Sequence, residues 1–370
     1  MVHHLYIHVP FCARRCSYCD FSIAVRKRIP AQEYLSAVRA ELEMLGVIGP
    51  LETIYLGGGT PSLLPPASIA ALLQDVSHFA PALDEVEVTL EANPEDVTPG
   101  TAAAWRAAGV NRVSLGVQSF DDRVLSWMHR LHDAARARVA VRTLRAAGFD
   151  NVSLDLIFAV PVELERDWAR DLEQATDLAP EHLSLYGLTV EPRTPLARWV
   201  ERGRAAAPTD ERYADEYLFA HERLAMAGYV FYEVSNAARD GRGSRHNSAY
   251  WNGRPYLGVG PAAHSFDGHG RRWNQSAWEA YRRAVADGRS PVESEELLTA
   301  EQRQLEHVYL ALRTRDGLPH SAFHRPSPSF TALVEQGWLV EQAGRVKCTV
   351  EGWLRLDALV AALTGPSGSF

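Results

Sequence analysis

The feature that most constrains the fold is a repeated alternation of short apolar runs and helical patterns over the first two-thirds of the chain. The strand-like runs are residues 5–9, 53–56, 86–90, 112–115, 152–157 and 182–188. Between them, apolar side chains recur at helical spacing in residues 31–45, 68–79, 101–108, 133–147 and 166–178. Six β/α units in succession predict a parallel sheet with helices outside it. Six is fewer than the eight units of a full TIM barrel, so we expect an α/β fold with a partial, open (β/α)6 barrel.

The last third of the chain follows a different pattern. Residues 209–227 predict another helix, and residues 229–266 are rich in Gly, Asn, Tyr and Trp without clear periodicity, which indicates a long functional loop. Two helices, a β-hairpin and a last helix are then predicted for residues 301–313, 329–336, 338–349 and 352–363. We therefore expect a core barrel in residues 1–238, a connecting region in 239–298, and a small winged-helix-like α+β domain in 299–370.

The charge pattern excludes some partners. Net charge is −8, and residues 300–370 carry seven Lys or Arg against seven Asp or Glu. A nucleic-acid footprint needs a basic face, so we expect no nucleic-acid partner, even for a winged-helix-like module. No run approaches the ~20 apolar residues that span a bilayer, and no signal peptide is visible. We expect a cytoplasmic protein, and peripheral association with a membrane stays open.

Three of the four cysteines lie close together, directly after the first predicted strand. Cys12, Cys16 and Cys19 form a Cys-x3-Cys-x2-Cys pattern, whereas Cys348 is distant and is expected in the core. An odd trio in a chain without an export signal indicates metal ligation rather than disulfides. Zinc is the alternative, but it usually takes four ligands and CxxC pairs. The pattern favours a [4Fe-4S] cluster with one iron left open to an external ligand.

This pattern, with the aromatic Tyr18 before its last cysteine, resembles the radical SAM superfamily. Members bind S-adenosylmethionine (SAM) to the open iron and on reduction can cleave it to a 5′-deoxyadenosyl radical. The cofactor supplies the hard chemistry, and the protein orients and shields it. Whether this chain cleaves SAM stays open.

Polar or glycine-containing motifs end the second, third, fourth and sixth predicted strands, and Asp155 lies in the fifth. Carboxyl ends of parallel strands meet at one edge of a sheet, so these motifs should surround one site. The resemblance assigns a glycine turn to the methionine amino group, because a Cβ would block the approach, and an arginine to its carboxylate. It implies SAM contacts at Tyr6, Tyr18, Gly58, Gly59, Thr60, Glu91, Gln118, Arg130 and Asp155. Relatives have a glycine where this chain has Ala159, which puts the shape of that loop in question.

Within the superfamily the chain resembles a group that contains oxygen-independent coproporphyrinogen III oxidase and the HemW-type heme chaperones. The oxidase has a fourth cysteine where this chain has Phe21, and a long N-terminal extension where only five residues precede Tyr6. The segment His246-Asn-x-x-Tyr250-Trp251 resembles a chaperone motif. These features favour the chaperone over the oxidase.

Chemically, the His246 segment suits heme. Imidazole is a common axial ligand of heme iron, Tyr250 and Trp251 offer flat apolar faces, and Arg245 and Arg254 could pair with propionates. Two alternatives stay open. His264 is a second candidate ligand, or the segment only packs a loop around a structural histidine.

We therefore expect a heme chaperone that binds heme and transfers it to an acceptor protein, and that carries a [4Fe-4S] cluster and exchangeable SAM. The acceptors would include membrane-associated respiratory proteins, and a homodimer stays open. The alternative is a coproporphyrinogen III dehydrogenase, a radical SAM enzyme of heme biosynthesis.

Overall fold

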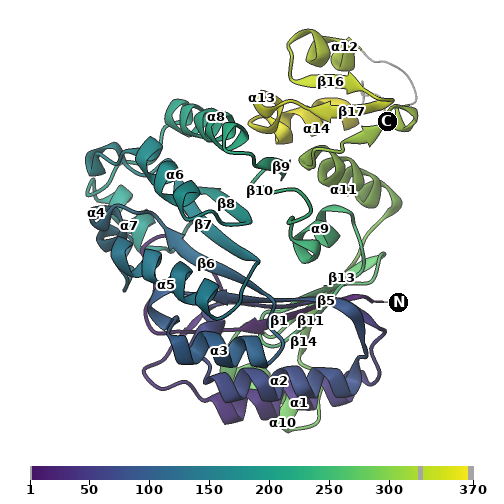
Figure 1. Ribbon diagram of the computed structural model, residues 1–370. Coiled ribbons are helices and arrows are strands. Elements are labelled where there is room, and N and C mark those ends of the chain that lie inside the picture. Colours follow the sequence, from purple (N-terminus) through teal and green to yellow (C-terminus); the bar gives the residue numbers. More distant parts are fainter. Residues whose placement is uncertain (1, 324–327, 366–370) are drawn as a thin grey trace.

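The computed structural model describes residues 2–323 and 328–365, and its core is an open, nine-stranded sheet (Figure 1). The strand order is β11-β1-β4-β5-β6-β7-β8-β10-β9. From β1 to β8 each strand pairs in parallel with its neighbour. These six strands are β1 (His4–Val9), β4 (Leu51–Gly58), β5 (Ala82–Ala92), β6 (Arg112–Gln118), β7 (Val152–Phe158) and β8 (His182–Gly187). The predicted partial barrel is confirmed.

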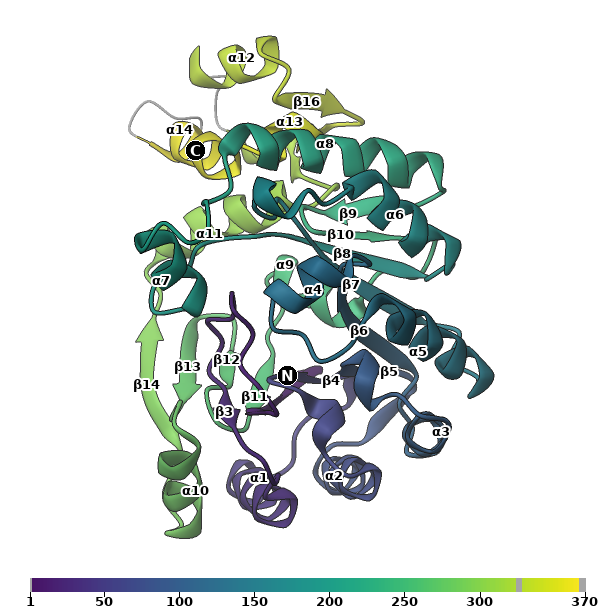
Figure 2. The same ribbon diagram turned by 90° about the vertical axis from the view of Figure 1, so that its left-hand side faces the viewer.

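Helices cover the outer face of this sheet, as Figures 1 and 2 show. In α1, the buried side chains Tyr34, Leu35, Val38 and Leu42 recur at helical spacing, which gives one apolar face that packs on the strands. The helices between strands are α1 (Ala31–Leu45), α2 (Pro66–Phe79), α3 (Pro99–Ala107), α4 (Asp122–Trp127), α5 (Ala134–Ala146) and α6 (Trp168–Asp177). After β8 come α7 (Pro195–Glu201) and α8 (Asp210–Met226).

The prediction of one long loop in residues 229–266 is wrong. This segment forms β9 (Val230–Glu233), β10 (Asn236–Ala238), α9 (Arg245–Trp251), β11 (Leu257–Val259) and β12 (His264–Phe266). The strand β11 adds to the free edge of β1 in parallel, and β10 adds to β8 in antiparallel orientation. Each strand has only three or four residues, which is too short for a period-two pattern to stand out.

The connecting region and the C-terminal module pack beside the barrel. β12, β13 (Gly270–Asn274) and β14 (Val292–Leu297) form an antiparallel sheet, and α10 (Trp278–Ala286) lies against α1. The C-terminal module has the predicted order of helices and hairpin, with a sheet of order β15-β17-β16. Its elements are α11 (Ala300–Arg313), β15 (Leu318–Pro319), α12 (Pro328–Glu335), β16 (Leu339–Gln342), β17 (Arg345–Cys348), α13 (Val350–Trp353) and α14 (Leu356–Thr364). As expected, Cys348 is buried.

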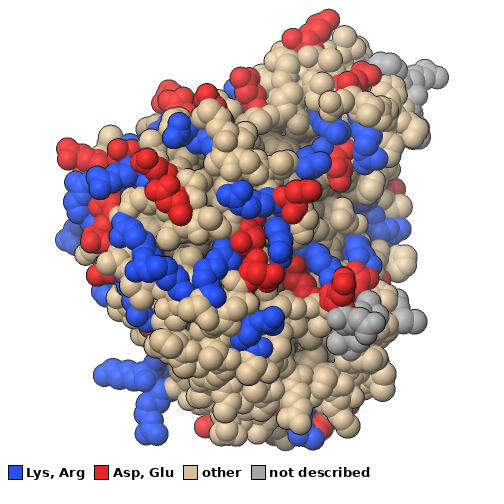
Figure 3. Space-filling view, viewed as in Figure 1, with Lys and Arg blue, Asp and Glu red and all other residues tan. Residues whose placement is uncertain are grey.

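Two surface properties bear on partners. Positive and negative side chains intermingle over the face in Figure 3, without a large patch of one sign. Within residues 2–323 and 328–365, no helix combines the length and apolar character needed to cross a bilayer.

Candidate cluster and cofactor site

The three clustered cysteines line one cavity of about 430 Å³ at the carboxyl ends of the parallel strands. The loop that holds them starts at β2 (Phe11–Cys12), which pairs with β3 (Ala24–Val25). All three are free thiols. Burial raises the pKa of Cys12, and it raises the pKa of Cys19 to about 11. A thiolate at these positions therefore depends on a bound cation, which fits an iron–sulfur cluster.

The glycine turn after β4 packs against the chain that leads into the cysteine loop. A Cβ on Gly59 would lie 2.8 Å from the carbonyl oxygen of Phe11, so no side chain fits at that position. Thr60 follows, and its Oγ1 lies 3.4 Å from Sγ of Cys12. The turn thus needs glycine so that the chain leading into the cysteine loop can pack against it. This reason adds to the predicted one, which is the close approach of a ligand.

Two partly buried carboxylates face the same cavity. Glu91, on β5, accepts hydrogen bonds from the backbone N–H of Gly58 (3.0 Å) and the hydroxyl of Tyr55 (2.8 Å). Burial raises its pKa to about 7. Asp155, on β7, accepts from the hydroxyl of Ser114 (3.1 Å), and burial raises its pKa as well. Both groups could accept hydrogen bonds from hydroxyl or ammonium groups of a ligand.

Arg130 ties the cysteine loop to two strand ends. Its Nη2 donates to Oδ1 of Asn93 (2.6 Å) and to the carbonyl of Gly116 (2.8 Å), and its Nη1 donates to Sγ of Cys16 (3.5 Å). Its Nε is buried and has no partner among the residues that the structure describes. The cavity thus contains a fixed cation beside a cluster cysteine, in a position to bind a carboxylate.

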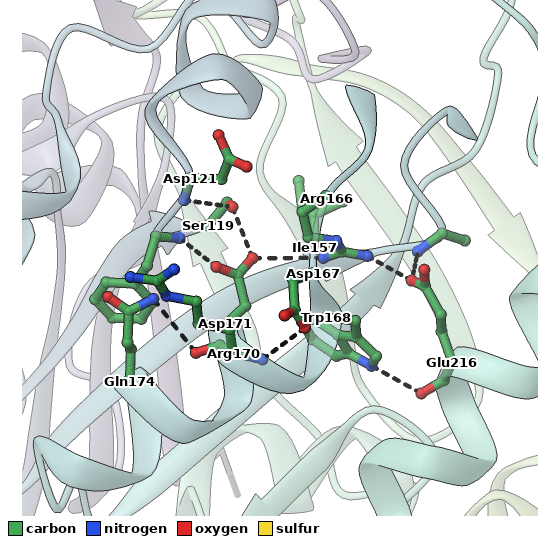
Figure 4. Close-up of polar contacts among 12 residues, drawn as sticks. Ser119, Asp121, Ile157, Arg166, Asp167, Trp168, Arg170, Asp171, Gln174 and Glu216 are labelled. Carbon is green, nitrogen blue, oxygen red and sulfur yellow. Dashed lines mark hydrogen bonds and ion pairs between the residues drawn. The ribbon is translucent and has the colours of Figure 1, made fainter. Parts of the chain in front are cut away.

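Behind the cavity, buried charges hold the ends of β6 and β7 (Figure 4). Asp171, on α6, accepts from the hydroxyl of Ser119 (2.7 Å) and the backbone N–H of Phe120 (2.8 Å). Arg166 donates to the carbonyl of Ile157 (3.0 Å) and lies 3.5 Å from Asp171. Gln118 of β6 and Ile157 of β7 line the cavity near the same two strand ends, so this network supports the site from outside the lining.

The same network holds Ala159, where the family resemblance led us to expect a glycine. Ala159 has a φ of 57°, a backbone conformation that favours glycine. Its N–H donates to the carboxylate of Glu216 on α8 (2.6 Å), which also pairs with Arg166. The loop therefore keeps the left-handed conformation at a cost of about 1 kcal/mol.

Most of the residues predicted to contact SAM meet in this cavity. The predicted residues that line it are Cys12, Cys16, Tyr18, Cys19, Gly58, Gly59, Thr60, Glu91, Gln118, Arg130 and Asp155. Asp96 also lines it and was not predicted. Its carboxylate accepts from Ser62 (2.6 Å), and burial raises its pKa to about 6. It follows a strand end by four residues, where no motif marks it.

Tyr6 lies elsewhere, at a second cavity of about 560 Å³. Its hydroxyl lies 3.1 Å from Nδ1 of His8, which lines the same cavity. The ring of His8 abuts Gly58, where a Cβ would lie 2.5 Å from Cε1, and its Nε2 donates to the carbonyl of Ser22 in the cysteine loop (3.1 Å). Because Gly58 lines the first cavity, His8 forms part of a partition between the two cavities.

The predicted heme motif divides between the second cavity and the wall behind it. Tyr250 and Trp251 line the cavity. His246 is buried and lies outside the lining: its Nδ1 is 2.7 Å from Oγ1 of Thr53, and its Nε2 is 2.8 Å from the hydroxyl of Tyr250. Burial lowers the pKa of His246 to about 3. Because of these two contacts, both ring nitrogens of His246 already have a hydrogen-bond partner.

The other suggested heme contacts are also divided. His264 lines the second cavity. Arg254 instead pairs with Glu52 through two hydrogen bonds of 2.9 and 2.8 Å, and Arg245 donates to the carbonyl of Glu85. The arginines that line the cavity are Arg271 and Arg303, from segments that no sequence motif connects with heme.

Comparison with known proteins places the chain in a family. A family model of the radical SAM superfamily matches residues 6–175. The heme chaperone HemW of Mycobacterium tuberculosis (strain ATCC 25618 / H37Rv) is 41% identical over 98% of this chain and 94% of the relative. The chain belongs to the HemW family of the radical SAM superfamily. Heme chaperone HemW of Bacillus subtilis (strain 168) is 34% identical over 86% of this chain and 85% of its own length.

A solved structure shares the fold. Coproporphyrinogen III oxidase (HemN) from Escherichia coli superposes with a TM-score of 0.82 over 98% of this chain and 89% of that chain, at 22% identity. For a HemW-family chain, membership of the superfamily implies a [4Fe-4S] cluster and SAM. The first cavity fits both groups, because it combines free thiols, a glycine turn, acceptor carboxylates and a buried guanidinium.

Proposed function

We propose that this protein is a heme chaperone, which binds heme and hands it to an acceptor protein. The observation that carries the proposal is the 41% identity to a heme chaperone HemW over nearly the full length of both chains. A second cavity, separate from the cysteine cavity, is consistent with it, because a cargo can then be held beside the cofactor site.

In this proposal Cys12, Cys16 and Cys19 hold the [4Fe-4S] cluster. The backbone at Gly58, Gly59 and Thr60 and the Arg130 guanidinium bind the methionine part of SAM. The ribose and nearby polar atoms face Glu91, Gln118 and Asp155, with Tyr18 beside the cluster loop. When bound, the cluster and SAM supply one-electron chemistry. The residues themselves orient the ligand and exclude water from it.

The second candidate is a coproporphyrinogen III dehydrogenase, which the shared fold with the E. coli oxidase favours. Against it stands Phe21, which lines the first cavity with 64% of its surface exposed and offers no fourth thiolate. The conversion of coproporphyrinogen III that this alternative requires can be assayed directly, with SAM, reductant and anaerobically reconstituted protein. Formation of protoporphyrinogen would replace the chaperone proposal.

The chaperone itself is tested by transfer. Reconstituted protein is loaded with hemin, freed of excess, and mixed with apomyoglobin as a model acceptor. We expect the Soret band of the loaded protein to convert to that of holomyoglobin. Absence of any heme-dependent Soret band in the wild-type protein would refute the proposal.

We further propose that the natural acceptors include membrane-associated respiratory proteins, that the protein acts in the cytoplasm and at the membrane surface, and that it can form a homodimer. Co-sedimentation with anionic vesicles tests whether the protein binds a membrane surface. Sedimentation velocity with and without the cluster tests whether it forms a homodimer.

A further inference from the structure

The second cavity has the chemistry of a porphyrin site, and this inference rests on the proposed heme-binding function. Its volume of about 560 Å³ lies within the range of small-molecule pockets. Five aromatic side chains line it: Tyr6, Tyr250, Trp251, Tyr256 and Phe266. It lies among β1, α9, β12, β13 and α11. Of these, α9, α11 and β13 are seen in the right half of Figure 1. Aromatic faces of this kind suit a flat apolar macrocycle.

Two histidines of the lining are available as ligands. His264 is on β12 and His307 is on α11, and both are exposed to solvent. Within residues 2–323 and 328–365, neither ring has a hydrogen-bond partner. The His264 ring stacks on Trp273, with centroids 5.6 Å apart and an angle of 22°, so its orientation is set in advance.

The charged residues of the lining match an amphipathic anion. Arg271 and Arg303 bring two positive charges, and Glu306 brings one negative charge that pairs with Arg271 at 2.6 Å. Arg303 donates to the carbonyl of Leu298 (2.6 Å), which leaves its other guanidinium nitrogens for a ligand. The wall therefore has an excess of positive charge opposite the two carboxylates of a heme.

His246 has a different task in this arrangement. It shares one face of α9 with Tyr250 at i, i+4 spacing, and its Nε2 lies 2.8 Å from the Tyr250 hydroxyl. The ring also stacks on Tyr55, with centroids 5.0 Å apart. A histidine that is packed and hydrogen-bonded on both nitrogens fixes the aromatic wall without reaching the cavity.

We propose that heme binds in this second cavity, with His264 as an axial ligand, Tyr250 and Trp251 against the macrocycle, and Arg271 and Arg303 at the propionates. His246 is a positioning residue for Tyr250. The first cavity stays available for the cluster and SAM.

The test is hemin titration of the anaerobically reconstituted full-length protein, followed by absorbance and resonance Raman spectra. His264→Ala should shift the Soret band and weaken hemin binding about tenfold or more, equal to about 1.4 kcal/mol. Added imidazole should restore the spectrum. His78→Ala, an exposed histidine on α2, is the matched control and should change nothing. His246→Ala should weaken binding and leave the axial-ligand signature in place.

The propionate contacts have a separate readout. Arg271→Ala and Arg303→Ala should weaken binding of hemin more than of its dimethyl ester, which lacks the two charges. Wild-type protein that binds no hemin would refute the proposed function itself. Wild-type protein that binds hemin, with a spectrum and affinity unchanged in His264→Ala, would overturn the ligand assignment. Unchanged affinity in both arginine variants and in Trp251→Ala would overturn the cavity.

Discussion

The two cavities of this molecule are built in opposite ways. The first lies at the carboxyl ends of consecutive parallel strands, and its lining falls between residues 12 and 191. The second draws on β1, α9, β12, β13 and α11, which span residues 6 to 310. A parallel sheet brings its strand ends to one edge whatever the helices do, so a motif after a strand predicts a site. No such rule brings together a helix, two short strands and a separate module.

The largest expected effect is loss of the cluster, which concerns the first cavity alone. Cys12→Ala, Cys16→Ala or Cys19→Ala should each remove the cluster after reconstitution, because in the proposed site these three thiolates are its full protein ligand set. Iron and sulfide analysis and the charge-transfer absorbance measure the loss. Cys348→Ala is the control and should keep full iron content. A cysteine variant with wild-type iron content would remove that residue from the ligand set.

A second change tests how the first cavity is supported from behind. Glu216→Ala removes the ion pair of the buried Arg166 with Glu216 and the acceptor of the Ala159 N–H. Because Arg166 keeps Asp171 at 3.5 Å, the free energy of unfolding should fall by about 2 kcal/mol, the order of a hydrogen bond to a charged group. Urea titration of the reconstituted protein measures it, with Glu222→Ala, an exposed change on the same helix, as the control.

The same Glu216→Ala variant should bind SAM more weakly and hemin normally, because the network holds the ends of β6 and β7 at the first cavity and, in the part of the chain that the structure describes, includes no residue that lines the second. Equal weakening of both ligands would mean that the two cavities do not respond independently to this support.

The pH dependence of SAM binding gives a smaller effect. The pKa of Glu91 is raised to about 7 in the free site, so below this pH a SAM contact to its carboxylate must displace a proton. SAM affinity should therefore fall as pH drops below about 7, by at most about tenfold per pH unit. Isothermal titration between pH 6 and 8 measures it, and Glu91→Gln should flatten the profile. A pH profile identical in both proteins would separate Glu91 from SAM binding.

Ala159→Gly should have the smallest effect. Glycine relieves the left-handed strain at φ 57° but increases the entropy of the unfolded chain by a similar amount. The free energy of unfolding should change by less than about 1 kcal/mol, and SAM affinity should stay the same. A large loss in the free energy of unfolding would show that the methyl group of Ala159 makes packing contacts that no other atom can replace.

The sequence predicted the barrel and the first cavity because both follow from strand ends and their motifs. It could not predict the direction in which a side chain points or the partners that it meets. Tyr6 and His8 alternate with buried Ile7 on β1 and line the second cavity, a fact that spacing from Cys12 does not reveal. His246 has the residue type of a ligand, but its two hydrogen-bond partners, Thr53 and Tyr250, are known only from the folded chain.

The partition at His8 has a thermodynamic consequence. This one imidazole contacts Gly58 of the first cavity, donates to Ser22 of the cysteine loop, and lines the second cavity. A rearrangement of the glycine turn or the cysteine loop that moves this imidazole therefore changes the wall of the neighbouring cavity. Thermodynamic linkage then applies: if a ligand in one cavity changes the affinity of the other cavity for its own ligand by some factor, the second ligand changes the affinity for the first by the same factor. Ligand binding in the first cavity and the affinity of the second cavity for heme are thus related by one coupling free energy. Two titrations, each carried out in the presence of the other ligand, must give the same value for it.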